Sequence, residues 1–146
     1  MLAELITGEA IRLNVGEADW EGVVEVAGEL LVSQGVVEAG YVEAMKHVVR
    51  EYGTYVVIAP GVALLHADPR AGVKQAGLSL VTLDPPVPFG HPEYDPVDIA
   101  IALGVEEDGA HLGLLSELAE ILCTKKKVER IRQADDREDV IDVLSA

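Results

Sequence analysis

The chain has 146 residues, of which 49% are apolar and only 4% aromatic, so one domain spanning residues 1–146 can build an aliphatic core. Its net charge of −15, from 26 acidic and 11 basic residues, argues against nucleic acid as the main partner. A single cysteine, Cys123, excludes an intrachain disulfide and favours a reducing compartment, so we expect a cytoplasmic protein. We see neither a signal peptide nor an apolar run long enough to insert into a membrane.

The first third of the chain predicts one strand followed by two helices. Residues 11–15 alternate apolar and polar side chains, as a short strand does. Asp19 can cap a helix that begins at the next residue and ends near Gln34. A second amphipathic helix is predicted over residues 37–52, with Gly53 as its C-terminal cap. Its apolar stripe consists of Tyr41, Ala44, Met45, Val48, Val49 and Tyr52.

The middle of the chain predicts several strands separated by turns. Proline and glycine mark the breaks after residue 59, around residues 68–72, and through the loop of residues 87–95. The apolar segment over residues 97–105 is typical of a central strand. The other predicted strands cover residues 55–58, 62–65 and 77–83, the last ending at Asp84-Pro85-Pro86.

The C-terminal third predicts helices. One should begin near His111 and place Leu112, Leu115, Ala119 and Leu122 on one face. Three lysines, residues 125–127, should separate it from a shorter helical segment, and a last helix should run over residues 136–144. The complete order, β-α-α-β-β-β-β-α-α-α, predicts an α/β fold with one mixed sheet covered by helices on both faces.

Several common catalytic motifs are absent from the sequence. There is no Gly-x-x-x-x-Gly-Lys phosphate loop, no Gly-x-Gly-x-x-Gly fingerprint and no Gly-x-Ser-x-Gly elbow. The four histidines and the cysteine do not have the spacing of a zinc site. These absences turn attention to isolated polar residues at the ends of predicted elements.

Three such residues could together form a site that handles phosphoryl groups. His66 follows a predicted strand and carries an imidazole that is partly neutral, and therefore nucleophilic, near pH 7. Arg50 lies at the end of a helix and His111 at the start of another. Phosphoryl transfer mainly requires positioning and charge stabilisation, which a nucleophile, a hydrogen-bond donor and a guanidinium can supply. Each residue also has a plainer interpretation: a half-buried structural histidine, a cation at a helix C-terminus, and a polar helix start.

The ordered motifs of the chain resemble those of a known family. The chain is similar to the IIA domain of the phosphoenolpyruvate-dependent sugar phosphotransferase system, mannitol/fructose type, and within it to the ascorbate-type branch. The resemblance covers nearly the whole chain. The matching segments are Ile11-Arg12-Leu13 with Trp20, Val37-Glu38 with Tyr41, residues 55–63, Gly72-Val73-Lys74, residues 77–83, Asp95-Pro96-Val97-Asp98 and His111.

The resemblance implies a role for each of the three residues. In the family, a histidine that ends a Gly-x-Ala-x-Pro-His stretch accepts a phosphoryl group, and this position falls on His66. The supporting histidine falls on His111, and the arginine that stabilises phosphate charge falls on Arg50. The resemblance also implies a three-layer α/β/α sandwich with a mixed central sheet, and neither metal nor organic cofactor.

The implied partners are proteins of one phosphorylation chain. The general phosphocarrier protein would phosphorylate His66, and a IIB component, through a cysteine in the ascorbate-type branch, would accept the group. A IIC membrane permease would then be an indirect partner that selects the sugar. The alternative is a stand-alone regulatory module whose phosphorylation state controls binding to a regulator.

One position departs from the family pattern. Leu65 stands where the family usually has the proline before the active histidine. Proline fixes φ near −65° and restricts the residue before it. We therefore expect a freer backbone at Leu65 and a less rigidly held His66.

Overall fold

Five strands form one mixed sheet in a computed structural model that describes residues 2–106 and 113–145. The strands are Ile11–Val15 (β1), Val57–Ala59 (β2), Val62–Leu65 (β3), Gly77–Val87 (β4) and Val97–Gly104 (β5). They lie in the order β1-β4-β5-β3-β2, so β5 is central, as the sequence predicts. The β1–β4 and β3–β5 pairs are parallel, whereas β4–β5 and β2–β3 are antiparallel.

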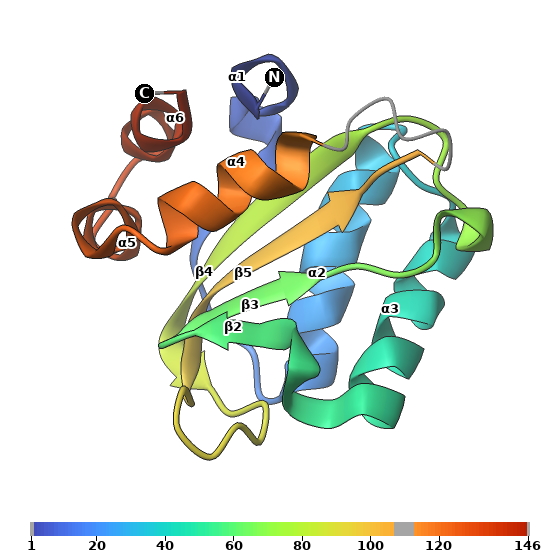
Figure 1. Ribbon diagram of the computed structural model, residues 1–146, viewed down its shortest axis with the longest axis horizontal. Helices are drawn as coiled ribbons and strands as arrows, with labels where there is room; N and C mark the ends of the chain where they lie inside the picture. Colours follow the sequence, from blue (N-terminus) through green and yellow to red (C-terminus); the bar gives the residue numbers. More distant parts are fainter. Residues whose placement is uncertain (1, 107–112, 146) are drawn as a thin grey trace.

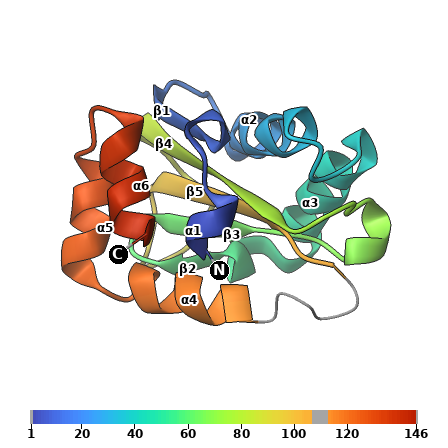
Figure 2. The ribbon, with the colours of Figure 1, turned by 90° about the horizontal axis from the view of Figure 1, so that it is seen from above.

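Helices cover both faces of this sheet, which confirms the predicted three-layer α/β/α arrangement (Figures 1 and 2). One face carries Trp20–Ser33 (α2) and Ala39–Tyr52 (α3). The other carries Leu2–Leu5 (α1), Gly113–Leu122 (α4), Lys125–Arg132 (α5) and Arg137–Ser145 (α6). Three short 3-10 turns, Gly8–Ala10 (η1), Gly53–Val56 (η2) and Pro69–Ala71 (η3), complete the elements. No helix in the described ranges has the length and apolar character that crossing a bilayer requires.

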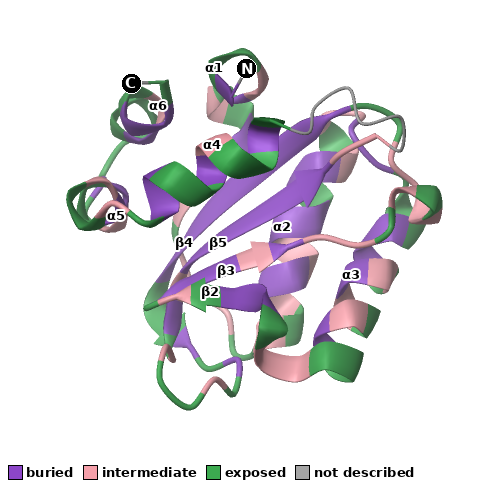
Figure 3. Cartoon of the chain, viewed as in Figure 1, coloured by how far each residue is buried: buried purple, intermediate pink, exposed green. Residues whose placement is uncertain are grey.

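The sheet divides the buried side chains into two cores. Along β5, Ile99 and Ile101 belong to the core beneath α4, α5 and α6, whereas Ala100 and Ala102 belong to the core beneath α2 and α3. Both faces of the strand are therefore buried (Figure 3). A strand covered on both sides needs no polar residues, which explains the continuous apolar run from Ile99 to Leu103.

The predicted ends of the two N-terminal helices are confirmed by their caps. The Asp19 carboxylate accepts a hydrogen bond from the Gly22 backbone N–H at 2.9 Å, as an N-cap does. Gly53 ends α3 with φ 58°, and its backbone N–H donates to the Val49 carbonyl. The start of α3 is two residues later than predicted, because Val37 forms an isolated antiparallel bridge with Val73.

Two strand boundaries differ from the prediction. Residues 53–56 form η2, so β2 begins only at Val57. β4 runs past Asp84-Pro85-Pro86 to Val87, which lies opposite Val97 of β5. The register of β4 against β5 shifts between Thr82 and Val87. The prolines are tolerated because they lie where the ladder is interrupted and no N–H is needed.

The C-terminal helices correct two further expectations. α4 buries Leu114, Leu118, Ile121 and Leu122, whereas Leu115 and Ala119, which we expected on one face with Leu122, are exposed. Leucines at helical spacing occur on both faces, so spacing alone could not choose between them. The three lysines form the first turn of α5 instead of separating two helices, because Val128 and Ile131 anchor that helix to the core.

Candidate phosphorylation site

His66 lies in the wall of a surface pocket, directly after the last residue of β3. The pocket has a volume of about 490 Å³ and is lined by Val48, Tyr52, Tyr55, His66, Ala67 and Asp68. Tyr52 and Tyr55 are 68% and 74% exposed, so the pocket has an aromatic rim at the protein surface. The predicted nucleophile is therefore within reach of a partner.

The backbone before His66 is held by the sheet. Leu65 is fully buried and lies opposite Ala102 in the parallel β3–β5 pair. A leucine there has an N–H, which a proline lacks, and it fills the core beneath α3. The expected looseness at Leu65 is therefore offset by strand pairing and burial.

The two ring nitrogens of His66 have different surroundings. Nδ1 is buried and has no hydrogen-bond partner among the described residues. Nε2 is not enclosed in the same way, and it makes no hydrogen bond to another described residue. Nε2 is accordingly the nitrogen that an incoming group can reach.

Asp68 contributes a carboxylate to the lining of the same pocket. It accepts hydrogen bonds from the Arg70 side chain at 2.8 and 3.1 Å and from the Arg70 backbone N–H at 2.9 Å. The Arg70 side chain, followed by that backbone bond, lowers the pKa of Asp68 to about 2. Asp68 is thus negatively charged at neutral pH, and its charge is paired.

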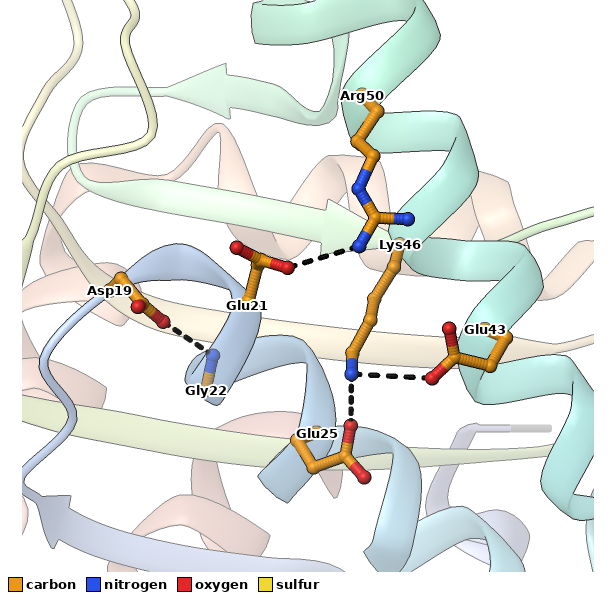
Figure 4. Close-up of polar contacts among 7 residues, drawn as sticks. All are labelled: Asp19, Glu21, Gly22, Glu25, Glu43, Lys46 and Arg50. Atoms are coloured by element: carbon orange, nitrogen blue, oxygen red, sulfur yellow. Dashed lines mark hydrogen bonds and ion pairs between the residues drawn. The ribbon is translucent and has the colours of Figure 1, made fainter.

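Arg50 lies on another face of α3. Its guanidinium bonds the Glu21 carboxylate of α2 at 3.0 Å (Figure 4). It also lies 5.8 Å from the centre of the Trp20 ring. The α3 residues that line the pocket are Val48 and Tyr52, each two positions away from Arg50. Two positions correspond to about 200° of rotation around a helix. In this arrangement Arg50 does not line the pocket.

The contact of Arg50 is one of a row of ion pairs between α2 and α3. Lys46 of α3 pairs with Glu25 of α2 and, at 3.3 Å, with Glu43 on its own helix (Figure 4). Hydrogen bonding to Glu25 raises the pKa of Lys46. This row supports the plainer interpretation of Arg50 as an interhelical contact, while its role in phosphate binding stays a prediction.

The remaining predicted site residue, His111, lies outside the described residues, so its supporting hydrogen bond also stays a prediction. Among the described residues, no group of three or more His, Cys, Asp or Glu side chains could hold a metal ion.

The apolar stripe of α3 differs from the prediction at its end. The spacing of Val48 and Tyr52 predicts that both side chains are buried. In the structure, these two residues line the pocket instead.

Comparison with protein families matches residues 4–146 to "Phosphoenolpyruvate-dependent sugar phosphotransferase system, EIIA 2". The chain belongs to this family. It is therefore an EIIA component, a phosphotransferase of sugar transport. This agrees with a histidine in the pocket wall that has one accessible ring nitrogen.

Relatives of this EIIA chain include ascorbate-specific and mannitol-specific components and the nitrogen regulatory protein IIA-Ntr of Neisseria meningitidis. The ascorbate-specific EIIA component of Escherichia coli K12 is 34% identical over 142 residues, which cover 96% of this chain and 92% of the relative. The solution structure of the cryptic mannitol-specific enzyme IIA CmtB from Escherichia coli has a TM-score of 0.88 at 26% identity, covering 99% and 97% of the two chains. An Escherichia coli complex of mannitol enzyme IIA with phosphorylated enzyme IIB matches with a TM-score of 0.83 at 26% identity, covering 96% of each chain.

Proposed function

We propose that His66 of this EIIA chain accepts a phosphoryl group on Nε2 from the phosphohistidine of the general phosphocarrier protein. The observation that carries the proposal is the position of His66 in the wall of an open pocket with only Nδ1 buried. A proton on the enclosed Nδ1 leaves the lone pair of Nε2 free to attack phosphorus. Geometry therefore favours one nitrogen over the other.

The transfer conserves charge and needs no redox partner. The P–N bond of the donor breaks as the bond between phosphorus and His66 Nε2 forms, and the electron pair returns to the donor imidazole. A IIB component then takes the group, onto a cysteine thiolate in the ascorbate-type branch. Arg50 and His111 remain the proposed charge-stabilising and hydrogen-bonding groups, and the first must leave Glu21 to act.

The aromatic rim suits protein partners. Tyr52 and Tyr55 present large, half-apolar side chains next to His66. Tyrosine is enriched in protein interfaces, where it supplies contact area at low entropic cost. We propose that the phosphocarrier protein and the IIB component dock over this rim in turn, with a IIC membrane permease as an indirect partner that selects the sugar. The lone cysteine fits a cytoplasmic location for these transfers.

A phosphorylation assay tests the acceptor. The protein is incubated with phosphoenolpyruvate, enzyme I and the phosphocarrier protein, and acid-labile phosphate is measured on wild type and His66→Ala. We expect label on the wild type alone, and His91→Ala serves as the matched histidine control. An unlabelled wild type, or equal labelling of His66→Ala, contradicts the proposal.

A second assay tests which IIB component accepts the phosphoryl group from His66. Phosphorylated protein is mixed with an ascorbate-type or a mannitol-type IIB component, and transfer is followed by loss of label from His66. Because the ascorbate-specific relative is 34% identical over nearly the whole chain, we expect faster transfer to the ascorbate-type partner. Labelling without transfer to either partner would favour the regulatory alternative.

A further inference from the structure

The hydroxyl of Tyr41 joins three separate segments of the chain. Tyr41 lies on α3 and is 1% exposed. Its hydroxyl accepts a hydrogen bond from the Ala67 backbone N–H at 2.9 Å and lies 2.8 Å from the carbonyl of Leu103 in β5. One hydroxyl proton and two lone pairs allow the hydroxyl to accept from Ala67 and to donate to one carbonyl. Of the two carbonyls in reach, that of Leu103 at 2.8 Å is nearer than that of Ala67 at 3.3 Å, so the hydroxyl donates to Leu103.

These bonds fall immediately after His66. Leu65, the residue before it, is fixed opposite Ala102 in the sheet, and Ala67, the residue after it, is fixed by Tyr41. The peptide unit between His66 and Ala67 is planar, so holding the Ala67 N–H also holds the His66 carbonyl. The backbone of His66 is thereby constrained on both sides.

We propose that Tyr41 is a positioning residue for His66: its hydroxyl takes over from strand pairing where β3 ends and holds the imidazole in the orientation that accepts a phosphoryl group. This inference rests on the proposed function of His66. Tyr41 is not itself a lining residue of the pocket; it bonds the backbone of Ala67, which is one, and so acts on His66 through that backbone.

The hydroxyl is more than a space-filling group. A phenylalanine would fill the same volume without placing a polar group in the core. Burial also disfavours the ionised phenolate and so raises the pKa of Tyr41 above its ordinary value. A buried hydroxyl is retained only where its hydrogen bonds offset the loss of water. Both of its bonds here go to backbone groups at the ends of β3 and β5, one of them adjacent to His66.

The test compares Tyr41→Phe with Ser79→Ala. Ser79 is also fully buried, and its hydroxyl donates to the Ala27 carbonyl at 2.8 Å, so its loss removes a comparable buried hydrogen bond from a site that does not adjoin His66. Initial rates of phosphorylation are measured at several phosphocarrier concentrations, at a temperature where both variants are folded. We expect Tyr41→Phe to lower the maximal rate about 10- to 100-fold with little change in KM, because misplacing a reacting group acts on the chemical step. Ser79→Ala should stay within about twofold of wild type.

Two results would overturn the inference: a wild-type rate in Tyr41→Phe, or an equal loss in Ser79→Ala. The His66 ring ¹⁵N resonances provide a second readout, since they should shift in Tyr41→Phe and stay in place in Ser79→Ala. If wild type itself is not labelled, the proposed function fails and the rates say nothing of Tyr41. If wild type is labelled and Tyr41→Phe matches it, only the positioning role fails.

A measurement on the wild-type chain covers the case in which Tyr41→Phe does not fold. Hydrogen exchange of the Ala67 amide should be as slow as that of the β3 amides, because its N–H is bonded to a buried hydroxyl. Exchange at the rate of an unprotected loop would overturn the role of Tyr41 without any variant.

Discussion

Asp68 brings a negative charge to the wall of the pocket that is to receive a phosphoryl group. Arg70 pairs with it through two side-chain bonds, which keeps the pair close to neutral. This arrangement limits repulsion between the carboxylate and an incoming phosphoryl group. The residues that follow His66 therefore tune the charge of the site although they do not react.

The ion pair of Asp68 with Arg70 predicts that the Asp68 carboxyl titrates at a lower pH than an ordinary aspartate. Its pKa is lowered to about 2, so the folded state favours the ionised carboxylate. The stabilisation from this pair is present above the ordinary aspartate pKa, near 4, and is lost as pH falls through about 2. NMR titration of the Asp68 carboxyl carbon should show this low pKa, and Arg70→Gln should return it toward 3.8. An unchanged pKa in Arg70→Gln would show that Arg70 is not the cause.

Arg50 gives a second prediction at the scale of single residues. We expect Arg50→Gln to slow phosphorylation of His66 about 10- to 100-fold if its guanidinium moves from Glu21 to the transferring group. Glu21→Gln removes the competing carboxylate and should not slow the reaction. Initial labelling rates measure both. A wild-type rate in Arg50→Gln would show that this arginine contributes only to the contact between α3 and α2. A half-exposed ion pair of this kind contributes about 0–1 kcal/mol to stability.

At the scale of elements, the close approach of α2 and α3 depends on Gly28. A Cβ added at Gly28 would lie 2.7 and 2.9 Å from the two methyl carbons of the buried Val42. We expect Gly28→Ala to lower the free energy of unfolding by about 1–3 kcal/mol through overpacking. Better helix propensity offsets about 1 kcal/mol at most. Urea denaturation measures the difference.

A double variant separates the steric effect from propensity. In a Val42→Ala background the space beside residue 28 is open, so Gly28→Ala should become neutral or stabilising. Gly40→Ala on α3 is a second control, since the nearest atom to its added Cβ is 3.9 Å away. The same loss of stability from Gly28→Ala in both backgrounds would show that Val42 is not the obstacle.

The elements also show where sequence reasoning reaches its limit. Alternation, caps and glycine signals predicted β1, β3, α2 and the end of α3, because these signals depend on neighbouring residues alone. The buried face of α4 and the partner of Arg50 depend on which elements pack together, which spacing does not encode. The hydrogen bonds of the Tyr41 hydroxyl could not be predicted for the same reason. Spacing predicts that the ring is buried, but it does not predict which backbone groups lie next to the hydroxyl.

At the scale of the whole molecule, the sheet separates the core under α4–α6 from the core that carries the pocket. Leu118 of α4 is fully buried in the first core, so Leu118→Ala should cost about 2–5 kcal/mol of unfolding free energy. The phosphorylation rate of the folded protein should stay within about twofold of wild type. Met45→Ala, a similar truncation in the second core, should also slow phosphorylation, because α3 carries Tyr41 and Val48. Denaturation curves and labelling rates together check this, and a slowed Leu118→Ala would contradict the separation.

The first and last helices of the described chain are neighbours, which matters for its use in larger assemblies. α1 and α6 lie side by side and share the core on the face opposite α3 (Figures 1 and 2). A linker of a few residues between them would close the chain into a ring, and new ends could be opened elsewhere without crossing the pocket. The same fold can therefore serve as a separate carrier or be spliced between other modules of one polypeptide, with the pocket of His66 left open in both cases.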